Sequence, residues 1–196
     1  LQCEEPGTWL VGDDGTVADV SVPGQAWMWG GGLNSAGEVV GGAPGGMYAV
    51  DVVAGTARRI VDARPIVVGA THALVERCDG ELHCEMLLVD TATGATSVPN
   101  LGEIDPYGAG LDAMSPDGTK ALTYRVPGGL TVVDLRTGTT TRLDNELWLS
   151  TDRGWLPDSD GLLMMSPLGL AVVRRDGTFV VIPGINNVLD IVVTAM

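Results

Sequence analysis

Cys78 and Cys84 are the residues with the most readily tested chemistry, because only the five residues DGELH separate them. A hairpin loop of this size can bring two sulfur atoms within bonding distance. A metal site made of Cys78, His83 and Cys84 is the alternative, but the second Cys-x-x-Cys or His pair that zinc sites usually contain is missing. Two free thiols are a third possibility. The spacing favours a disulfide and no metal, and a disulfide indicates an oxidising compartment.

The other reactive residues give little support for catalysis. His72 and His83 are the only histidines, and neither has sequence neighbours that suggest a triad or a metal cluster. His72 is interpreted as a turn residue. Cys3 is left over, and two roles stay open for it: a lipid-anchored residue, or a thiol paired with another segment or chain. The sequence therefore predicts no catalytic residue and no cofactor, and an enzyme is the weaker hypothesis.

The elements that would position these residues are short β-strands. The apolar runs are short and rich in Val, Thr, Leu and Ile, as strands prefer, and 28 Gly and 11 Pro supply many turns. No window has the pattern of a long capped amphipathic helix. The fold class is therefore predicted to be all-β.

A sequence unit recurs about every 40 residues. The stretches "YAVDVVAGTARRI", "LLVDTATGATSV" and "TVVDLRTGTTTRL" each contain an apolar strand, a turn with Asp and Gly, and a second strand. The turn glycines fall at 15, 55, 94, 138 and 177. Gly supplies the positive φ that such turns need, and Asp closes them by hydrogen bonds. A period near 40 with strand patterning is typical of a propeller with one four-stranded blade per repeat.

A second turn motif precedes each of these units. It is clearest in "AMSPDGTKALTY" and "GWLPDSDGLLMM", where Pro116 and Pro157 fix φ at the first corner of the turn. With "SPDG" followed by a strand and then "hydrophobic-x-hydrophobic-Asp-x-x-x-Gly", the chain resembles the TolB-like and WD40-like families of bacterial β-propeller repeats, from about residue 8 to about residue 190. The resemblance implies a propeller fold but no single function, because such propellers serve as adaptors, docking platforms, lids and enzymes.

The repeats predict one β-propeller domain over residues 1–196. Four blades are expected at about 25–62, 63–99, 100–144 and 145–184. Residues 1–24 and 185–196 would form a fifth blade that is split between the termini and closes the ring. The alternative is that the chain is part of a larger ring of six to eight blades.

One loop face is the predicted binding site. In a propeller, the connections between blades lie on the same face as the loops that join the second and third strands of each blade. An acidic rim with two aromatic residues on this face would suit a basic protein partner or a sugar ring. The predicted binding residues are Asp62, Arg64, Glu103, Asp105, Tyr107, Asp144, Glu146 and Trp148.

Charge and hydropathy limit the partners. A formal net charge of −14 leaves no basic footprint for nucleic acid, and no stretch approaches the length of a membrane span. The sequence therefore predicts an extracytoplasmic (secreted, periplasmic or cell-surface), non-catalytic scaffold that binds a protein or glycan, as a subunit of a larger cell-envelope complex. The alternative is a propeller enzyme or enzyme lid, a hydrolase or lyase with its site at the central channel.

Overall fold

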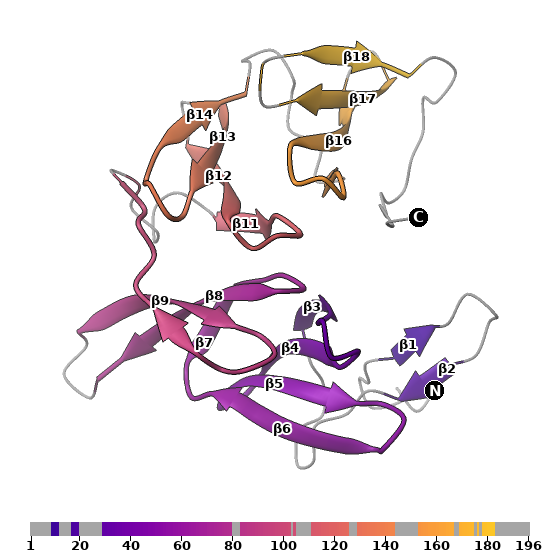
Figure 1. The fold of residues 1–196 in the computed structure, drawn as a ribbon, viewed down its shortest axis with the longest axis vertical. Coiled ribbons are helices and arrows are strands. Elements are labelled where there is room, and N and C mark those ends of the chain that lie inside the picture. The colour runs from indigo at the N-terminus through magenta and orange to yellow at the C-terminus, as the bar shows by residue number, and fades with distance from the viewer. Residues whose placement is uncertain are drawn as a thin grey trace, which may run out of the picture. The chain divides into compact units, whose positions relative to one another are not determined.

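The computed structural model of the chain consists of strands and turns. It describes residues 9–11, 17–19, 29–79, 83–102, 104, 111–125, 129–143, 153–166, 169–174, 176 and 178–182. All regular elements within these ranges are strands, labelled β1 to β18 (Figure 1). The all-β prediction is therefore confirmed. The chain divides into two compact units, residues 1–98 and 99–196, and each is described by itself.

The first unit contains a hairpin and two four-stranded antiparallel sheets. The hairpin pairs β1 (Trp9–Val11) with β2 (Val17–Asp19). The first four-stranded sheet runs in chain order through β3 (Trp29–Leu33), β4 (Val39–Ala43), β5 (Gly46–Asp51) and β6 (Thr56–Val61). The second sheet has the same order, with β7 (Arg64–Val68), β8 (His72–Cys78), β9 (Cys84–Asp90) and β10 (Thr96–Ser97).

The second unit contains two further four-stranded antiparallel sheets with the same chain-order meander. The third sheet consists of β11 (Leu111–Met114), β12 (Lys120–Arg125), β13 (Gly129–Asp134) and β14 (Thr140–Arg142). The fourth sheet consists of β15 (Arg153–Trp155), β16 (Gly161–Ser166), β17 (Gly169–Arg174) and β18 (Phe179–Val181). Each sheet lies within one of the four intervals expected for a blade. Closure into one ring, and the split fifth blade, stay predictions.

The Asp-x-x-x-Gly turns join the third and fourth strands of the first three sheets. In the second sheet, the Asp90 carboxylate accepts the backbone N–H groups of Ala92 at 3.0 Å and Thr93 at 2.7 Å. Gly94 then takes a φ of 75°, which residues with a side chain rarely adopt. The hydrogen bonds to Thr93 lower the pKa of Asp90, so the turn is stabilised by an ionised carboxylate.

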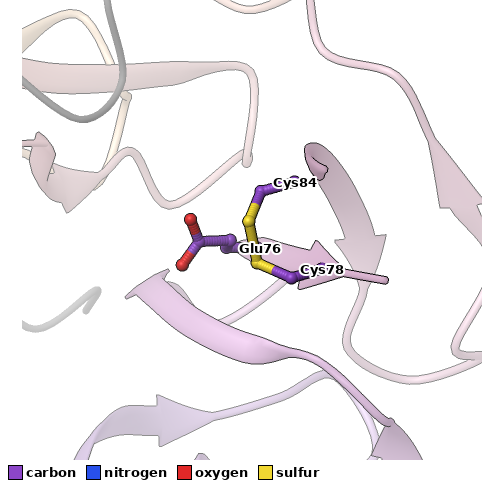
Figure 2. Close-up of side chains that lie close together, drawn as sticks. All are labelled: Glu76, Cys78 and Cys84. Atoms are coloured by element: carbon purple, nitrogen blue, oxygen red, sulfur yellow. A yellow bond between two sulfur atoms is a disulfide. The ribbon is translucent and has the colours of Figure 1, made fainter. Parts of the chain in front are cut away.

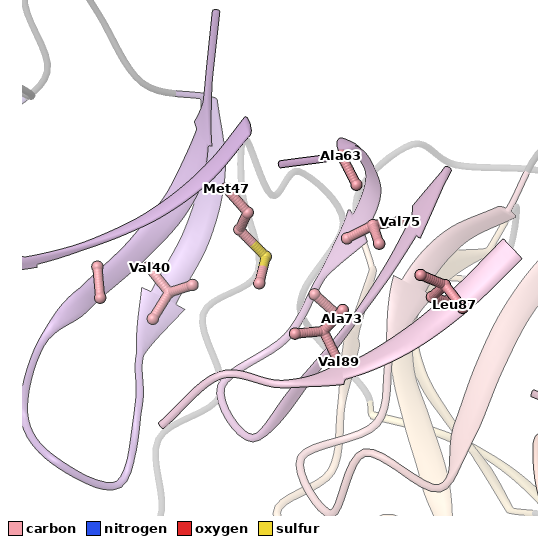
Figure 3. Packing of buried hydrophobic residues seen from close by; sticks show 8 residues of the cluster. Val40, Met47, Ala63, Ala73, Val75, Leu87 and Val89 are labelled. Carbon is pink, nitrogen blue, oxygen red and sulfur yellow. The ribbon is translucent and has the colours of Figure 1, made fainter. Parts of the chain in front are cut away.

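The core of the first unit lies between its two four-stranded sheets. Figure 3 shows Met47 of β5 extending into the space between the sheets, with Val40 of β4 on one side and Val75 of β8 on the other. All three side chains are fully buried. The cluster is built from alternate residues of each strand, as the two-residue period of a strand requires.

An ion-paired cluster of polar side chains also links these two sheets. Arg58 of β6 donates two hydrogen bonds to the Glu38 carboxylate, at 2.9 and 2.6 Å. The same guanidinium reaches the second sheet, where it donates to the backbone carbonyls of Thr91 (3.3 Å) and Ala92 (2.9 Å). Asn34 donates both to Glu38 and to the carbonyl of Thr91. The cluster thus connects the first sheet to the turn between β9 and β10.

The third and fourth sheets share a core of their own. Leu122 and Val132 of the third sheet pack in one buried cluster with Trp155 and Leu162 of the fourth. The backbone N–H of Asp117 also donates to Ser159 Oγ at 3.1 Å, which joins the two Pro-Asp turns. Among the described residues, no helix is long and apolar enough to cross a membrane.

Candidate functional site

The structure describes two of the eight predicted binding residues, Asp62 and Arg64. Asp62 lies in the connection between β6 and β7, Arg64 is the first residue of β7, and both are exposed. The other six lie outside the described residues, and their roles stay predictions. They are Glu103, Asp105, Tyr107, Asp144, Glu146 and Trp148.

Asp62 and Arg64 line an open hollow with a volume of about 460 Å³. We call it the connection hollow. Its walls come from the turn between β4 and β5, the connection between β6 and β7, and the first part of β7 with the last part of β8. A second-to-third-strand turn and a connection between sheets therefore meet at one place, as the propeller interpretation expects of a single loop face. The lining residues are Ala43, Pro44, Gly45, Gly46, Asp62, Ala63, Arg64, Pro65, Glu76, Arg77 and Cys78.

Small residues supply the buried part of the connection hollow. Ala43 and Ala63 are 2% and 8% exposed, and Pro65 is buried. Gly46 has a φ of 146°, and a methyl group added there would overlap the backbone carbonyl oxygen of Val61. Only Gly therefore allows β5 to begin so close to the end of β6. This close approach brings the turn between β4 and β5 beside the connection between β6 and β7.

Charged side chains surround these small residues. Arg64 on β7 is the cross-strand partner of Glu76 on β8, and its Nε donates to a carboxylate oxygen at 2.7 Å. The Glu76 side chain is only 10% exposed, whereas that of Arg64 is 65% exposed. A buried carboxylate needs such a partner, because an unpaired charge in that position would be costly. Arg64 therefore neutralises Glu76 and still presents most of its guanidinium to solvent.

Two further ion pairs stand next to this one. Arg77 pairs with Glu85 across β8 and β9, with 2.8 Å from its Nε to the carboxylate. Arg59 pairs with Asp62. Each arginine at or next to the connection hollow thus has one acidic partner, so these ion pairs carry no net charge in a chain whose formal charge is −14.

A disulfide closes the hairpin at the edge of the connection hollow. Cys78 and Cys84 are directly opposite each other on β8 and β9, and their sulfur atoms are bonded, as predicted. The backbone N–H of Asp79 donates to the carbonyl of His83 at 2.9 Å in the adjoining loop. The bond and the hydrogen bond together join the end of β8 to the start of β9 next to Arg77.

The disulfide also bears on the metal alternative. Figure 2 shows the Glu76 carboxylate beside the Cys78–Cys84 bond, and one ligand atom from each of these residues lies within 4.8 Å of the others. A metal would need thiolates, and bonded sulfurs are not thiolates. His83, the third ligand of the metal hypothesis, lies instead with Nδ1 at 3.4 Å from the Asp79 carboxylate. In this oxidised form Cys78 and Cys84 form a structural bridge and offer no thiolate to a metal.

The two histidines do not form a common site. His72 is the first residue of β8 and pairs with Asp90 at the far end of β9, whereas His83 comes just before Cys84 at the near end. They therefore stand at opposite ends of the hairpin formed by β8 and β9. The interpretation of His72 as a turn residue was wrong by one position, because the strand begins with it.

Sequence reasoning missed the residues that complete the connection hollow. Glu76, Arg77 and Pro44 belong to none of the sequence motifs. The available signal was the charge order on β7 and β8, since antiparallel pairing places Arg64 opposite Glu76. The irregularity of the ladder between Pro65 and Val67 makes that register hard to derive beforehand.

Comparisons with known proteins identify the architecture. Family models give no match to the chain, and neither do curated protein sequences. Solved structures do match. TolB from Acinetobacter baumannii aligns with 85% of the chain (TM-score 0.53, 16% identity), and a putative TolB from Agrobacterium tumefaciens aligns with 78% (TM-score 0.54, 14% identity). An auxiliary nutrient binding protein from Bacteroides ovatus aligns with 90% (TM-score 0.54, 12% identity).

The fold is that of a β-propeller. The predicted resemblance to TolB-like propellers is therefore confirmed at the level of the fold, and identities of 12–16% carry it no further. The chain spans 45%, 60% and 51% of the lengths of these three structures. The number of blades stays a prediction.

Proposed function

We propose that this chain is a non-catalytic, extracytoplasmic β-propeller that docks a partner protein at the connection hollow. In this proposal it serves as a binding scaffold within a cell-envelope assembly. The proposal rests on one observation, the connection hollow, which gathers small buried residues and exposed arginines beside a strand-to-strand turn and a connection between sheets.

The composition of the connection hollow favours a protein partner. Arginine is enriched at the energetic centres of protein interfaces, because its guanidinium combines several donors with a flat stacking surface. Arg64 and Arg77 are 65% and 51% exposed and are already oriented by Glu76 and Glu85. Side chains that are held in place before binding lose less conformational freedom when a partner docks. A glycan would also find hydrogen-bond donors here, and it is the second occupant that the experiment below distinguishes.

Two observations support the compartment and the class. An intramolecular disulfide persists in oxidising surroundings such as the periplasm or the extracellular space. Among the similar structures, one is named as an auxiliary nutrient binding protein and two are named as TolB. These names belong to those proteins and support, for this chain, a role in binding.

The experiment compares two arginines in matched environments. Arg77 pairs with Glu85 at the connection hollow, with side chains 51% and 53% exposed. Arg174 pairs with Asp158 on the second unit, with side chains 40% and 50% exposed. Both pairs are exposed, so Arg77→Ala and Arg174→Ala should alter stability by less than about 1 kcal/mol. Binding by the two variants therefore reports on the surface and not on folding.

The assay is capture from an extracytoplasmic extract of the source cells, followed by titration of the purified captured component. We expect wild type and Arg174→Ala to retain the same protein, and Arg77→Ala to bind it about ten-fold more weakly. Equal affinity of the two variants would overturn the proposed site. Capture that survives protease digestion of the extract but not glycosidase digestion would replace the protein partner with a glycan.

A further inference from the structure

The repeats allow one position to be compared between sheets. Lys120 opens β12 and pairs with Asp134, the aspartate of the turn between β13 and β14. In the first sheet the corresponding turn aspartate is Asp51, next to Val50, and Val50 pairs with Val39. Glu38, just before Val39, therefore holds the position of Lys120. The same turn spacing makes Arg58 on β6 the counterpart of Thr141 on β14.

In the first sheet, the side chains of Glu38 and Arg58 occupy this position. Arg58 and Glu38 form a two-point hydrogen-bonded ion pair there, and Arg58 extends to the carbonyl of Ala92 in the second sheet. The third sheet has the shorter Thr141 in place of the arginine. Nothing on this strand therefore occupies the volume that the guanidinium takes in the first sheet.

The third sheet has a hollow at this position, with a volume of about 240 Å³. We call it the lysine hollow. It is lined by Lys120, Val132, Asp134, Thr137, Thr139 and Thr141. Val132 also belongs to the core that the third and fourth sheets share, so the apolar end of the lysine hollow is continuous with that core.

Lys120 is the only lysine in the chain, and as a residue it is 8% exposed. Its ammonium nitrogen lies 3.3 Å from Thr119 Oγ1 and 3.5 Å from the Asp117 carboxylate. These two contacts are the ones it makes among the described residues. An ammonium group has three N–H donors, so the lining of the hollow includes a buried cation that can donate hydrogen bonds.

Two carboxylates lie close to this cation. Burial would raise the pKa of Asp117, but hydrogen bonds from Ser115 and Thr119, together with the charge of Lys120, lower it to about 2. Burial opposes ionisation of Asp134 too, and here backbone N–H groups of the turn lower the pKa. Both carboxylates are therefore ionised at neutral pH. Asp134 lines the hollow and Asp117 lies beside Lys120, so the cation and its two neighbouring carboxylates sum to one negative charge, which disfavours an anionic ligand.

The remaining polar groups are hydroxyls. Thr137 Oγ1 donates to Thr139 Oγ1 at 3.0 Å. Thr139 and Thr141 each carry a hydroxyl donor, and all three hydroxyl oxygens can accept hydrogen bonds. A ligand that matches this set is neutral, carries several hydroxyl groups, and has an apolar C–H face for Val132. The volume lies below the range of about 300–1,000 Å³ that is usual for drug-sized ligands, so the ligand is small.

We propose that the lysine hollow is a binding site for a small neutral polyhydroxy compound of about the size of a monosaccharide. Lys120 and Asp134 hold its hydroxyl groups from one side, and the three threonines complete the hydrogen bonding. This site is separate from the connection hollow, because the two lie in different units of the chain. It does not depend on the proposed docking function.

The test combines two readouts on the whole chain. Saturation-transfer NMR and calorimetry measure the binding of glucose, galactose, mannose and glycerol, with acetate as an anionic probe. Amine labelling with an N-hydroxysuccinimide ester, followed by peptide mapping, measures the access of reagent to Lys120. Because Lys120 is the only lysine, its peptide reports the site without interference from other side-chain amines.

Thr141→Val removes one hydroxyl and keeps the shape of the side chain. The control is Ser97→Ala, because Ser97 on β10 pairs with Leu88 on β9 as Thr141 on β14 pairs with Val132 on β13. We expect at least one of the polyhydroxy compounds to bind in the millimolar range and to slow labelling of Lys120. Thr141→Val should weaken that binding about ten-fold, and Ser97→Ala should leave it unchanged.

Three results would each overturn the proposal. The first is that none of the four polyhydroxy compounds shows saturable binding to wild type. The second is that acetate alone binds, which would make the site one for anions. The third is binding that Thr141→Val and Ser97→Ala affect equally, since this would place the ligand elsewhere. Unchanged thermal unfolding of both variants establishes that the comparison is made on folded protein.

Discussion

Replacing Glu38 with glutamine tests the polar cluster that links the first two four-stranded sheets. The change keeps the length of the side chain, removes its charge and replaces one acceptor oxygen with an N–H donor. In the wild type, hydrogen bonds from Arg58 and then Asn34 lower the pKa of Glu38 from 4.5 to about 2. The folded state therefore stabilises the ionised carboxylate, and the glutamine variant loses that stabilisation.

The size of the effect follows from this difference in pKa. A lowering from 4.5 to about 2 corresponds to about 3 kcal/mol of preference for the ionised form. The Glu38 side chain is 17% exposed, but that of Arg58 is 41% exposed, so solvent screens part of the interaction. We therefore expect Glu38→Gln to lower the free energy of unfolding by about 1–2 kcal/mol at pH 7.

The pH dependence has a defined sign. The folded-state pKa of Glu38 lies below the unfolded value, so its contribution is complete above about pH 4.5 and is lost as the pH falls through about 2. The difference in stability between wild type and Glu38→Gln should therefore be largest at pH 7 and should fall to about half or less at pH 3. Urea unfolding followed by tryptophan fluorescence at both pH values measures it.

Glu85→Gln is the matched control. Glu85 also pairs with an arginine across two strands, but both side chains of that pair are about half exposed. We expect this variant to lose less than about 1 kcal/mol. If Glu38→Gln and Glu85→Gln cost the same at pH 7, or if the cost of Glu38→Gln is the same at pH 3 as at pH 7, the linking role of the Glu38 cluster is refuted.

Three further predictions concern stability. Replacing Cys78 and Cys84 with serine should lower the free energy of unfolding by about 2 kcal/mol, because the bond closes a loop with a sequence separation of 6. Reduction of the wild type should lower its Tm as much as the double replacement does. In urea titrations, Gly46→Ala should lower the free energy of unfolding by more than about 2 kcal/mol, because a methyl group has no room there. Gly37 has a φ of 77° but open space around it, so Gly37→Ala should lower the free energy of unfolding by about 1 kcal/mol. Trp155→Phe should change Tm little, because the indole N–H of Trp155 is buried without a hydrogen-bond partner among the described residues and its removal offsets the lost packing.

The parts of the structure that follow from local rules could be predicted from the sequence. The Asp-x-x-x-Gly motif specifies a turn through its own atoms, because the aspartate accepts hydrogen bonds from the second and third residues after it and the glycine takes a positive φ. Strand type follows in the same way from short runs of β-branched residues between such turns. The pairing of Cys78 with Cys84 was equally local, because a five-residue loop leaves few other geometries.

The contents of the candidate sites could not be predicted in this way. The connection hollow depends on the register of β7 against β8, which shifts between Pro65 and Val67. Ser159 illustrates the same limit. It takes a φ of 57° where the corresponding turn has Gly118, and it is buried because its hydroxyl accepts from the backbone of Asp117. A left-handed serine looks unfavourable in the sequence, and only the neighbouring sheet explains it.

The turn motifs that recur between the sheets and the positions that differ between them therefore carry different information. The turn motifs recur because each sheet needs the same backbone geometry, and this recurrence says little about function. The residue at the start of the second strand does not recur in this way. It is Glu38, just before β4, in the first sheet, and His72 and Lys120, the first residues of β8 and β12, in the second and third. Of these three residues, Glu38 alone forms a two-point hydrogen-bonded ion pair within the described part of the chain, with Arg58 of the same sheet. A repeat protein can vary such a position without changing its fold, so a position where the repeats differ and a hollow remains is where a specific ligand should be sought.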